Sequence, residues 1–314
     1  NSEELFKEEI KKGWREVAEK FGDARRTRIL NIAKEDEEPT EIRVLQISMT
    51  NKNNIYLSET STLYKQKRGG VGKTGGSGKK VDDCAEHLFL STTHHKILFF
   101  TNKGKVYCKE GYEIPEAGRT AKGTAIINVI SIEQGEKITA VIPIKEFEAD
   151  KFIFMATNRG VVKKTNLELF KNLNKNGLYS INLDDKEELI GVELTDGNSE
   201  IVLATRNGIA IRFDEQDVRP MGRTAHGVRG ITLNFGDEVV AMDSVANEEC
   251  EVLTATEFGM GKRTAVREYP KRTRGGKGVI NMKITEKTGA VVGMRVINPE
   301  QEIMMITAGG IIIR

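Results

Sequence analysis

The sequence contains no apolar run long enough to cross a membrane. Although 38% of its 314 residues are hydrophobic, no apolar stretch reaches the roughly eighteen residues that a membrane-spanning helix requires. Residues 1–20 alternate charged and apolar side chains, a pattern that differs from the apolar centre of a secretory leader. We therefore expect a globular, cytoplasmic protein with a packed core and no membrane partner.

Cysteine is also scarce, and its distribution argues against covalent or metal cross-links. The three cysteines, Cys84, Cys108 and Cys250, are widely separated and odd in number. This arrangement does not suit a disulfide framework, and no pair of cysteines has the spacing of a zinc site. We expect three reduced, buried thiols and no structural metal.

Groups that would form a catalytic or metal site are sparse as well. His94 and His95 precede a strand with no third ligand nearby, and His226 stands where a neighbouring repeat has lysine. The 6 tyrosines lack the surrounding acids that a metal-assisted, strand-cleaving tyrosine requires. No nucleophile has an adjacent base, so we expect no catalytic residue and no bound cofactor in this chain.

One glycine-rich segment superficially resembles a phosphate loop. Gly72, Lys73 and Thr74 match the end of that motif. The first glycine of the motif is missing, however, and no strand-to-helix context follows. The segment is therefore not interpreted as a nucleotide site.

The net charge of +2 says little about a polyanionic partner, because 48 basic residues are nearly balanced by 46 acidic ones. The distribution of the basic residues is more informative. Those flanked by glycine rather than by acids gather in two segments, with Lys65, Lys67, Arg68, Lys73, Lys79 and Lys80 in the first and Lys262, Arg263, Arg267, Lys271, Arg272, Arg274 and Lys277 in the second. Such clusters are typical of surfaces that bind an anionic polymer.

The amino-terminal residues have the pattern of an amphipathic helix. Over residues 3–21 the apolar side chains recur at the spacing of one helical face, and Gly22 ends the pattern. An acidic run at 35–38 is followed by Pro39, which is typical of a linker. We expect residues 1–40 to be the end of an upstream core and an acidic linker, and residues 41–314 to form a separate domain.

Residues 41–314 repeat with a period of about fifty residues. The marker is a threonine that ends an apolar strand and precedes a tight turn and a second strand. The markers are Thr50, Thr101, Thr157, Thr205, Thr256 and Thr307. Asn-x-Gly and related turns supply the positive φ that a tight hairpin requires, so each marker predicts a β-hairpin.

Two more strands are expected in each repeat. The third is predicted at 126–129, 179–183, 231–233 and 279–284, and the fourth at 138–142, 189–194, 239–245 and 291–297. Four strands in about fifty residues is the size of a propeller blade. The fold is therefore expected to be all-β, a six-bladed propeller-like ring with a short amino-terminal helix. The last repeat contains only a hairpin, which strands from elsewhere in the ring must complete.

A glycine-bearing, basic connection follows each hairpin. These connections are 66–73, 118–123, 173–177, 222–227 and 271–278. Equivalent positions in a ring point outward at regular angles, so the connections predict a positively charged rim rather than a pocket. Glycine lets backbone amides approach phosphate, and Arg and Lys neutralise phosphate without reading base edges. The expected partner is double-stranded DNA, bound through its backbone without sequence specificity and with strong salt dependence.

Three segments resemble the A subunit of bacterial DNA gyrase, in the type IIA topoisomerase family. Residues 66–72, Gln-Lys-Arg-Gly-Gly-Val-Gly, resemble the box Gln-Arg-Arg-Gly-Gly-Lys/Arg-Gly that marks the carboxyl-terminal domain of this subunit, with Val71 replacing a basic residue. Residues 272–278 look like a second, partly degenerate copy, and residues 21–27 are similar to the end of the cleavage core. The repeats extend the resemblance over nearly all of residues 41–314.

The resemblance implies a β-pinwheel, a propeller-like disc with strands exchanged between neighbouring blades, whose rim wraps DNA. Wrapping would present a DNA segment to the cleavage core, so that ATP-driven strand passage introduces negative supercoils. The catalytic tyrosine would lie in the upstream core and the ATPase on the B subunit, which are the expected protein partners. ATP and magnesium would serve the full enzyme and not this segment, which is expected to be monomeric when isolated.

The residues assigned to DNA binding combine the box with the basic positions of the connections. The box is expected to set the wrapping geometry, and the other cations to contact phosphate. The set comprises Lys65, Gln66, Lys67, Arg68, Gly69, Gly70, Gly72, Lys73, Arg119, Lys122, Lys175, Arg223, Arg272, Arg274 and Lys277.

Three alternatives stay open. The matching domain of topoisomerase IV shares the architecture and binds DNA with less wrapping, but six units and a near-intact box favour gyrase. A protein-binding propeller would use the faces of the disc, and a near-neutral net charge would suit it. A glycan-acting or hydrolytic propeller would need carboxylates around its central channel, yet Asp184, Asp185 and Asp214 share no repeat position.

Overall fold

The computed structural model describes residues 2–22, 43–50, 54–59, 73–74, 85–116, 123–174, 176–301, 305–306 and 311–313. The chain divides into two compact units, Asn1–Thr40 and Glu41–Arg314. Among the residues described, no helix is both long and apolar enough to cross a membrane.

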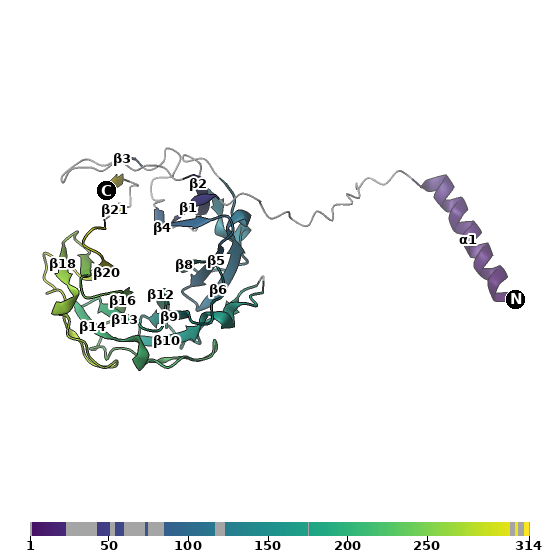
Figure 1. Cartoon of the computed structure of the whole chain (residues 1–314). Coiled ribbons are helices and arrows are strands. Elements are labelled where there is room, and N and C mark those ends of the chain that lie inside the picture. Colours follow the sequence, from purple (N-terminus) through teal and green to yellow (C-terminus); the bar gives the residue numbers. More distant parts are fainter. Residues whose placement is uncertain are drawn as a thin grey trace. The chain divides into compact units, whose positions relative to one another are not determined.

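The described part of the first unit is one amphipathic helix, α1 (Ser2–Phe21), shown in Figure 1. It starts with acidic residues in its first turn and ends with a lysine in its last, which complements the helix dipole. It stops before Gly22, as the sequence predicts. The apolar stripe lies uncovered within this part of the unit, with Trp14 77% and Phe21 78% exposed.

The second unit is built from β-hairpins (Figure 1). Its described residues form the hairpins β1 (Val44–Thr50) with β2 (Asn54–Glu59), β5 (Lys96–Thr101) with β6 (Lys105–Glu110), β9 (Phe152–Thr157) with β10 (Val161–Asn166), β13 (Glu200–Thr205) with β14 (Ile209–Asp214), β17 (Glu251–Thr256) with β18 (Gly261–Ala265), and β21 (Met305–Ile306) with β22 (Ile311–Ile313). The hairpin prediction is confirmed for each marker threonine that the structure describes, whereas Thr307 lies outside the described residues.

Three of the marker threonines, Thr101, Thr157 and Thr205, close their hairpin turns with side-chain hydrogen bonds. Oγ1 of Thr157 accepts a hydrogen bond from the amide of Val161 at 3.2 Å and donates to the carboxylate of Glu187 at 2.6 Å. Thr101 and Thr205 accept a hydrogen bond from the amide four residues later in the same way, at 3.3 and 3.2 Å. Because these hydroxyls are buried, an apolar residue would leave an amide without a partner. The threonine that marks the repeat is therefore structural.

A further strand pairs with the first strand of five hairpins. These inner strands are β4 (Ala85–Thr92), β8 (Ile138–Ile144), β12 (Leu189–Thr195), β16 (Val239–Val245) and β20 (Val291–Ile297). Figure 1 shows them on the inner side of a curved row of sheets. Each ladder is antiparallel and is interrupted by a bulge beside the marker threonine. The four predicted fourth strands are confirmed, and β4 is an additional one.

The third strand of each repeat differs from its prediction. It is only two residues long in the described cases, which are β3 (Lys73–Thr74), β7 (Thr124–Ala125), β11 (Leu178–Tyr179), β15 (Val228–Arg229) and β19 (Val279–Ile280). The apolar residues that suggested longer strands fill the core instead, and Ile126, Ile181 and Ile231 are each at most 2% exposed. Residues 126–128 form a 3-10 helix. The prediction was wrong because a short apolar run does not distinguish a strand from a buried loop.

Each short strand pairs with the hairpin before it rather than with its own. β7 pairs with β2, β11 with β6, β15 with β10 and β19 with β14. β3 follows the first hairpin and pairs with β22 of the last one. The result is a set of open sheets, four with four strands and two with three among the described residues, joined by exchanged strands.

The hydrophobic core lies between neighbouring sheets. Phe100 of β5 packs in one cluster with Met155 of β9, and Phe154 of β9 packs in the next cluster with Leu203 of β13. Alternate residues of one strand thus enter different clusters, because successive side chains point to opposite faces. A sheet buried on both faces has strands that are apolar throughout, which explains the continuous apolar runs of the repeats.

The cysteines form no cross-link in the part of the chain that the structure describes. Cys108 and Cys250 are free thiols, and Cys84 lies outside the described residues. Cys250 is buried as expected, but Cys108 is half-buried. Burial raises the pKa of the Cys108 thiol to about 11, so the thiol stays protonated at neutral pH and is a poor nucleophile.

Candidate nucleic-acid interface

Two of the basic connections are described in full, and we call them arms. In Figure 1 the strands that precede them, β14 and β18, lie on the outer side of the curved row of sheets. The arm after β14 spans residues 215–227, and the arm after β18 spans residues 266–278. Each leads into an exchanged strand of the preceding sheet. The second arm also runs along β14, with a parallel bridge between Arg212 and Lys271. An arm therefore crosses from its own hairpin to the outermost strand of the neighbouring sheet.

A glycine precedes each of four exchanged strands, and the backbone requires it. Gly123, Gly177, Gly227 and Gly278 have φ values between 72° and 115°. A Cβ on Gly278 would lie 2.5 Å from the carbonyl oxygen of Ala210. A side chain would strain the turn and clash with the neighbouring sheet. The sequence predicts that these glycines let backbone amides approach phosphate. The conformation of the backbone and the close packing explain them without a ligand.

The arginine in the box-like copy helps to build its own arm. Nε of Arg274 donates to the carbonyl of Asp217 at 2.9 Å, and Nη1 donates to the carbonyl of Arg229 at 3.1 Å. The amide of Gly275 donates to the carbonyl of Gly230 at 2.6 Å. These bonds fasten one arm to the preceding one. Because a guanidinium has five donors, Arg274 keeps further donors for a ligand.

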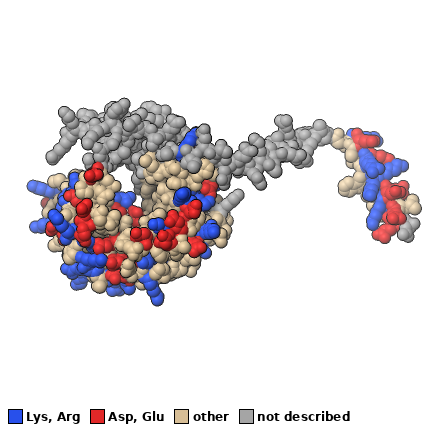
Figure 2. All heavy atoms as spheres, viewed as in Figure 1, with Lys and Arg blue, Asp and Glu red and all other residues tan. Residues whose placement is uncertain are grey.

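Besides Arg274, whose side chain binds carbonyl groups, three predicted cations are not neutralised by an acid within the described chain. Arg272 and Lys277 are exposed and Arg223 is half-buried. Arg219 and Arg229, which the sequence pattern did not indicate, are exposed in the same way and also form no ion pair there. Figure 2 shows basic side chains along the outer edge where Figure 1 places β14 and β18. Cations without acidic partners keep their charge for an external anion.

Arg229 lies on an exchanged strand, which the sequence pattern did not predict as a separate element. It is the second residue of exchanged strand β15, and its equivalents Tyr179 and Ile280 are 57% and 75% exposed. The first residue of each of these strands is half-buried. The outward position is therefore the second one after the positive-φ glycine, a signal that becomes useful once the exchanged strand is known.

Other cations of the carboxyl-terminal cluster are held by acids. Nζ of Lys271 lies 2.8 Å from Asp214 and 3.0 Å from Glu200, and Arg263 pairs with Glu251. The hydrogen bonds to Asp214 and Glu200 raise the pKa of Lys271. Its charge is present but already compensated. The cluster seen in the sequence therefore overstates the positive charge available to a ligand.

Ten of the fifteen residues assigned to DNA binding lie outside the described part of the chain. They are Lys65, Gln66, Lys67, Arg68, Gly69, Gly70, Gly72, Arg119, Lys122 and Lys175. Lys73 begins β3 and pairs with Ile312 of β22. The box thus ends directly before the strand that links the first hairpin region to the last hairpin.

One arm carries a polar cluster. Nδ1 of His226 lies 3.0 Å from the carbonyl oxygen of Asn182, 3.9 Å from Asp184 and 3.8 Å from Glu187. The ligand atoms of His226 and the two acids lie within 4.8 Å of one another, close enough for a metal ion. Nδ1 donates to a carbonyl, however, and Glu187 already accepts from Thr157. We therefore interpret the cluster as a contact between the arm, which carries His226, and the turn that carries Asp184 and Glu187, rather than as a metal site.

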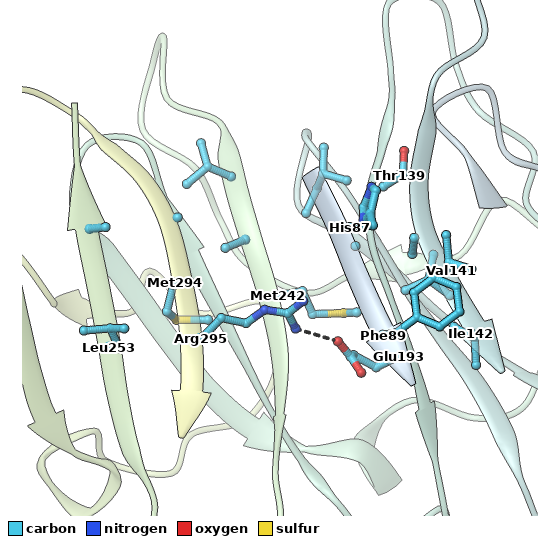
Figure 3. A pocket seen from close by; sticks show the side chains of 18 residues that line it. His87, Phe89, Thr139, Val141, Ile142, Glu193, Met242, Leu253, Met294 and Arg295 are labelled. Atoms are coloured by element: carbon cyan, nitrogen blue, oxygen red, sulfur yellow. Dashed lines mark hydrogen bonds and ion pairs between the residues drawn. The ribbon is translucent and has the colours of Figure 1, made fainter. Parts of the chain in front are cut away.

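A cavity of about 630 Å³ lies between the inner strands (Figure 3). Most of the residues that line it have apolar side chains, among them Met242 and Met294. Nη1 of Arg295 binds Glu193 at 3.1 Å and lies 3.5 Å from Asp243. Burial, followed by the charge of Asp243, raises the pKa of Glu193 to about 7, although Arg295 opposes the shift.

Two acids other than Asp184, Asp185 and Asp214 do share a repeat position. Glu193, Asp243 and Arg295 are the fifth residues of β12, β16 and β20. Both carboxylates are engaged by the same guanidinium. A hydrolytic propeller needs a carboxylate pair that is free to exchange protons with a substrate, so this arrangement does not favour one.

Comparisons with known proteins agree with this architecture. The sequence profile of the family described as DNA gyrase C-terminal domain, beta-propeller, matches residues 95–145, 151–196, 199–246 and 251–298. The DNA gyrase A protein of Staphylococcus epidermidis strain ATCC 12228 is 41% identical over 317 residues, covering 99% of this chain and 35% of the relative. Its counterpart in Staphylococcus aureus strain COL is 42% identical over 321 residues, covering 99% of this chain and 36% of that relative. The chain thus spans about a third of the length of these relatives.

Solved structures show the same fold. The C-terminal domain of DNA topoisomerase IV superposes with a TM-score of 0.70 at 27% identity, over 87% of this chain and 83% of that chain. The C-terminal domain of DNA gyrase A gives 0.74 at 24% identity, over 86% and 88%, and supports the fold alone. Because the family profile matches more than half of the chain, repeat by repeat, the chain belongs to the DNA gyrase C-terminal domain family of β-propellers.

Proposed function

We propose that the second unit binds and wraps double-stranded DNA as the carboxyl-terminal domain of a gyrase A protein. It binds the phosphate backbone without sequence preference at its outer edge and so enables negative supercoiling by the full enzyme. The observation that carries this proposal is a set of cations on consecutive arms that no described acid neutralises. They are Arg223, Arg272 and Lys277.

The placement of these cations suits a long, curved ligand. Figure 1 shows the sheets following one another along an arc, and the arms lie at its outer edge. Smoothly bending a duplex of 20–30 base pairs costs on the order of 1–6 kcal/mol. Several phosphate contacts, each releasing counterions, offset this cost. Basic side chains on loops contact phosphate groups, which are the same at every base pair. We therefore expect binding to the DNA backbone rather than recognition of a sequence.

We further infer that the unit is a six-bladed β-pinwheel. The pairing of β3 with β22 supports this inference, because it supplies the last hairpin with an exchanged strand from the region after the first hairpin. The pairing of β7 with β2 follows the same rule one blade later. A ring completed in this way leaves few free sheet edges.

The complete protein is proposed to contain an upstream core, since this chain covers only 35% of its relative in Staphylococcus epidermidis. That core carries the catalytic tyrosine, and a B subunit supplies the ATPase. The enzyme works on the chromosome in the cytoplasm and uses ATP and magnesium. The segment 41–314 contributes no catalytic group or cofactor site and is monomeric in isolation.

The test is to measure energy transfer between the labelled ends of a short duplex, together with binding affinity across a salt titration. We expect the ends to approach on binding, and log affinity to fall with log salt by roughly 0.9 for each phosphate contact. Absence of binding at low salt would contradict the proposal and favour a protein-binding propeller.

The box is tested in the same assay. Replacing residues 66–72 with alanine is expected to abolish the approach of the duplex ends while leaving much of the nonspecific affinity. Loss of both, or of neither, would contradict a special role of the box in wrapping.

A topoisomerase IV domain is the second candidate, because the solved domain of that enzyme superposes with a TM-score of 0.70. Binding without approach of the duplex ends would favour it over gyrase. The 41% identity to a gyrase protein over 99% of this chain favours the gyrase assignment.

A further inference from the structure

A buried lysine lies beneath one of the arms. Lys163 of β10 is 0% exposed, a rare environment for an ammonium group. Its Nζ donates to the carbonyl oxygen of Ser180 at 2.7 Å and to the carbonyl oxygen of Arg223. Ser180 follows exchanged strand β11, and Arg223 lies on the arm after β14. The side chain therefore connects three segments that are distant in the sequence.

We propose that Lys163 is a positioning residue for DNA binding, which fastens the arm of residues 215–227 and so holds Arg223 in place at the outer edge. This inference rests on the proposed function. With its carbonyl bound by Lys163, the main chain of Arg223 is fixed and mainly its side-chain torsions stay free. An arm ordered before binding loses less entropy when phosphate arrives, which strengthens binding.

The contact is sensitive to pH because no carboxylate of the described chain pairs with Lys163. Burial lowers the pKa of Lys163 to about 7, with a smaller contribution from the Arg223 guanidinium. Its ladder partner Met155 and the carbonyl of Ser180 carry no charge. Besides Arg223, the acidic, basic and imidazole groups of the arm are Glu215, Asp217, Arg219 and His226. Charge-assisted hydrogen bonds are about twice as strong as neutral ones, so the arm is held more firmly while Lys163 is protonated.

DNA affinity and folding stability should respond to pH in opposite directions. When the pH rises through about 7, Lys163 loses its proton, its bonds to the arm weaken and one positive charge disappears, so DNA affinity falls. The folded-state pKa lies below the ordinary value of 10.5, so the unfolded chain binds more protons between these values. Stability therefore rises with pH over that interval. A purely structural lysine would not produce the change in affinity.

The test uses the 314-residue chain and the variant Lys163→Met. Duplex affinity at fixed salt is measured from about pH 6 to about pH 8, with thermal unfolding and hydrogen exchange of the arm amides. We expect an unchanged or higher melting temperature, roughly threefold to tenfold weaker binding at the low-pH end, and no affinity step near neutrality. The arm amides should exchange faster. Lys163→Gln keeps neutral donors and should give intermediate affinity without the step.

Two controls isolate the role of Lys163. Lys164→Met removes the neighbouring buried ammonium, whose Nζ donates to the carbonyl of Glu215 at 3.1 Å. This bond holds the first residue of the same arm and not the stretch around Arg223, so the variant should lower stability while preserving the affinity step. His226→Gln removes the histidine of the same arm and should also preserve it. Loss of the step in Lys164→Met would show a general structural effect and overturn the proposal.

The outcomes separate this proposal from the proposed function. Wild-type affinity, pH dependence and arm exchange in Lys163→Met would overturn the positioning role even if the unaltered chain wraps DNA. If the unaltered chain binds no DNA, the proposed function fails and Lys163 has no binding role. Faster arm exchange in the variant would then show only that Lys163 orders the arm.

Discussion

Single polar side chains set the hairpin turns of this fold. Thr157 satisfies the amide of Val161 and also donates to Glu187, and Glu187 in turn accepts from the amide of Asp184 at 3.0 Å. One hydroxyl therefore connects the turn of its own hairpin to the turn that precedes the inner strand. Because these groups are removed from water, a donor or acceptor that loses its partner cannot bind water instead, and the folded state is destabilised.

Replacing Thr157 with valine should lower the free energy of unfolding by about 1–3 kcal/mol, because the amide of Val161 and the buried carboxylate of Glu187 lose a partner. Urea denaturation of the variant measures the change. Thr165→Val is the matched control, since the Thr165 hydroxyl is buried without a hydrogen-bond partner among the described residues. That control should be neutral or stabilising. Equal losses in both variants would contradict the assigned role.

The free cations of the interface could be predicted from the sequence only in part. Glycine spacing located the arms that carry Arg223 and Lys277. The compensation of Lys271 could not be foreseen, because its partners Glu200 and Asp214 lie on β13 and β14, in the neighbouring repeat. Whether a cation is available depends on acids brought close by folding, and sequence clustering carries no such information.

At the scale of elements, long periodic strands were predictable and short ones were not. Apart from the last hairpin, the hairpin strands and the inner strands are five to eight residues long, and the first strand of a hairpin is typically an apolar run that ends in threonine. The exchanged strands have two residues each, too few to show a period. Their partner is chosen by the packing of one sheet against the next, so the sequence indicated the repeat but not which hairpin each short strand would join.

Gly278 illustrates how an exchanged strand is aligned. Replacing it with alanine should cost more than about 1 kcal/mol, because φ is +75° and a Cβ would lie 2.5 Å from the carbonyl oxygen of Ala210. Denaturant unfolding measures the loss, and DNA affinity should fall with it because the strand anchors the basic arm. Gly222→Ala is the matched control, since nothing lies within 4 Å of its Cβ. Comparable losses in the two variants would contradict the assigned role of the backbone conformation and close contact of Gly278.

For the second unit as a whole, function depends on where charge is left uncompensated rather than on its total. The chain carries a net charge of only +2, and many of its cations are held by acids, as Arg212 is by Glu200 and Glu248. Arg272 and Lys277 stay free on an arm at the outer edge. A nearly neutral protein can therefore present a local positive potential to DNA while avoiding strong self-repulsion.

This distribution predicts how salt dependence should change when charge is removed. The triple variant Arg223→Gln, Arg272→Gln and Lys277→Gln removes three free cations without touching the core. If each contacts one phosphate, the slope of log affinity against log salt should become shallower by roughly 0.9 per residue. Fluorescence anisotropy with a nonspecific duplex over a range of salt concentrations measures this slope.

A matched control removes the same amount of charge away from the arms. Lys103, Arg159 and Lys186 are exposed and form no ion pair with a described residue, but they lie on turns beside the hairpins. Their replacement with glutamine changes the net charge equally. If the duplex follows the arms, this control should lower affinity only weakly and leave the slope nearly unchanged. An equal change of slope in both variants would mean that DNA responds to total charge, and that the arms are not the binding edge.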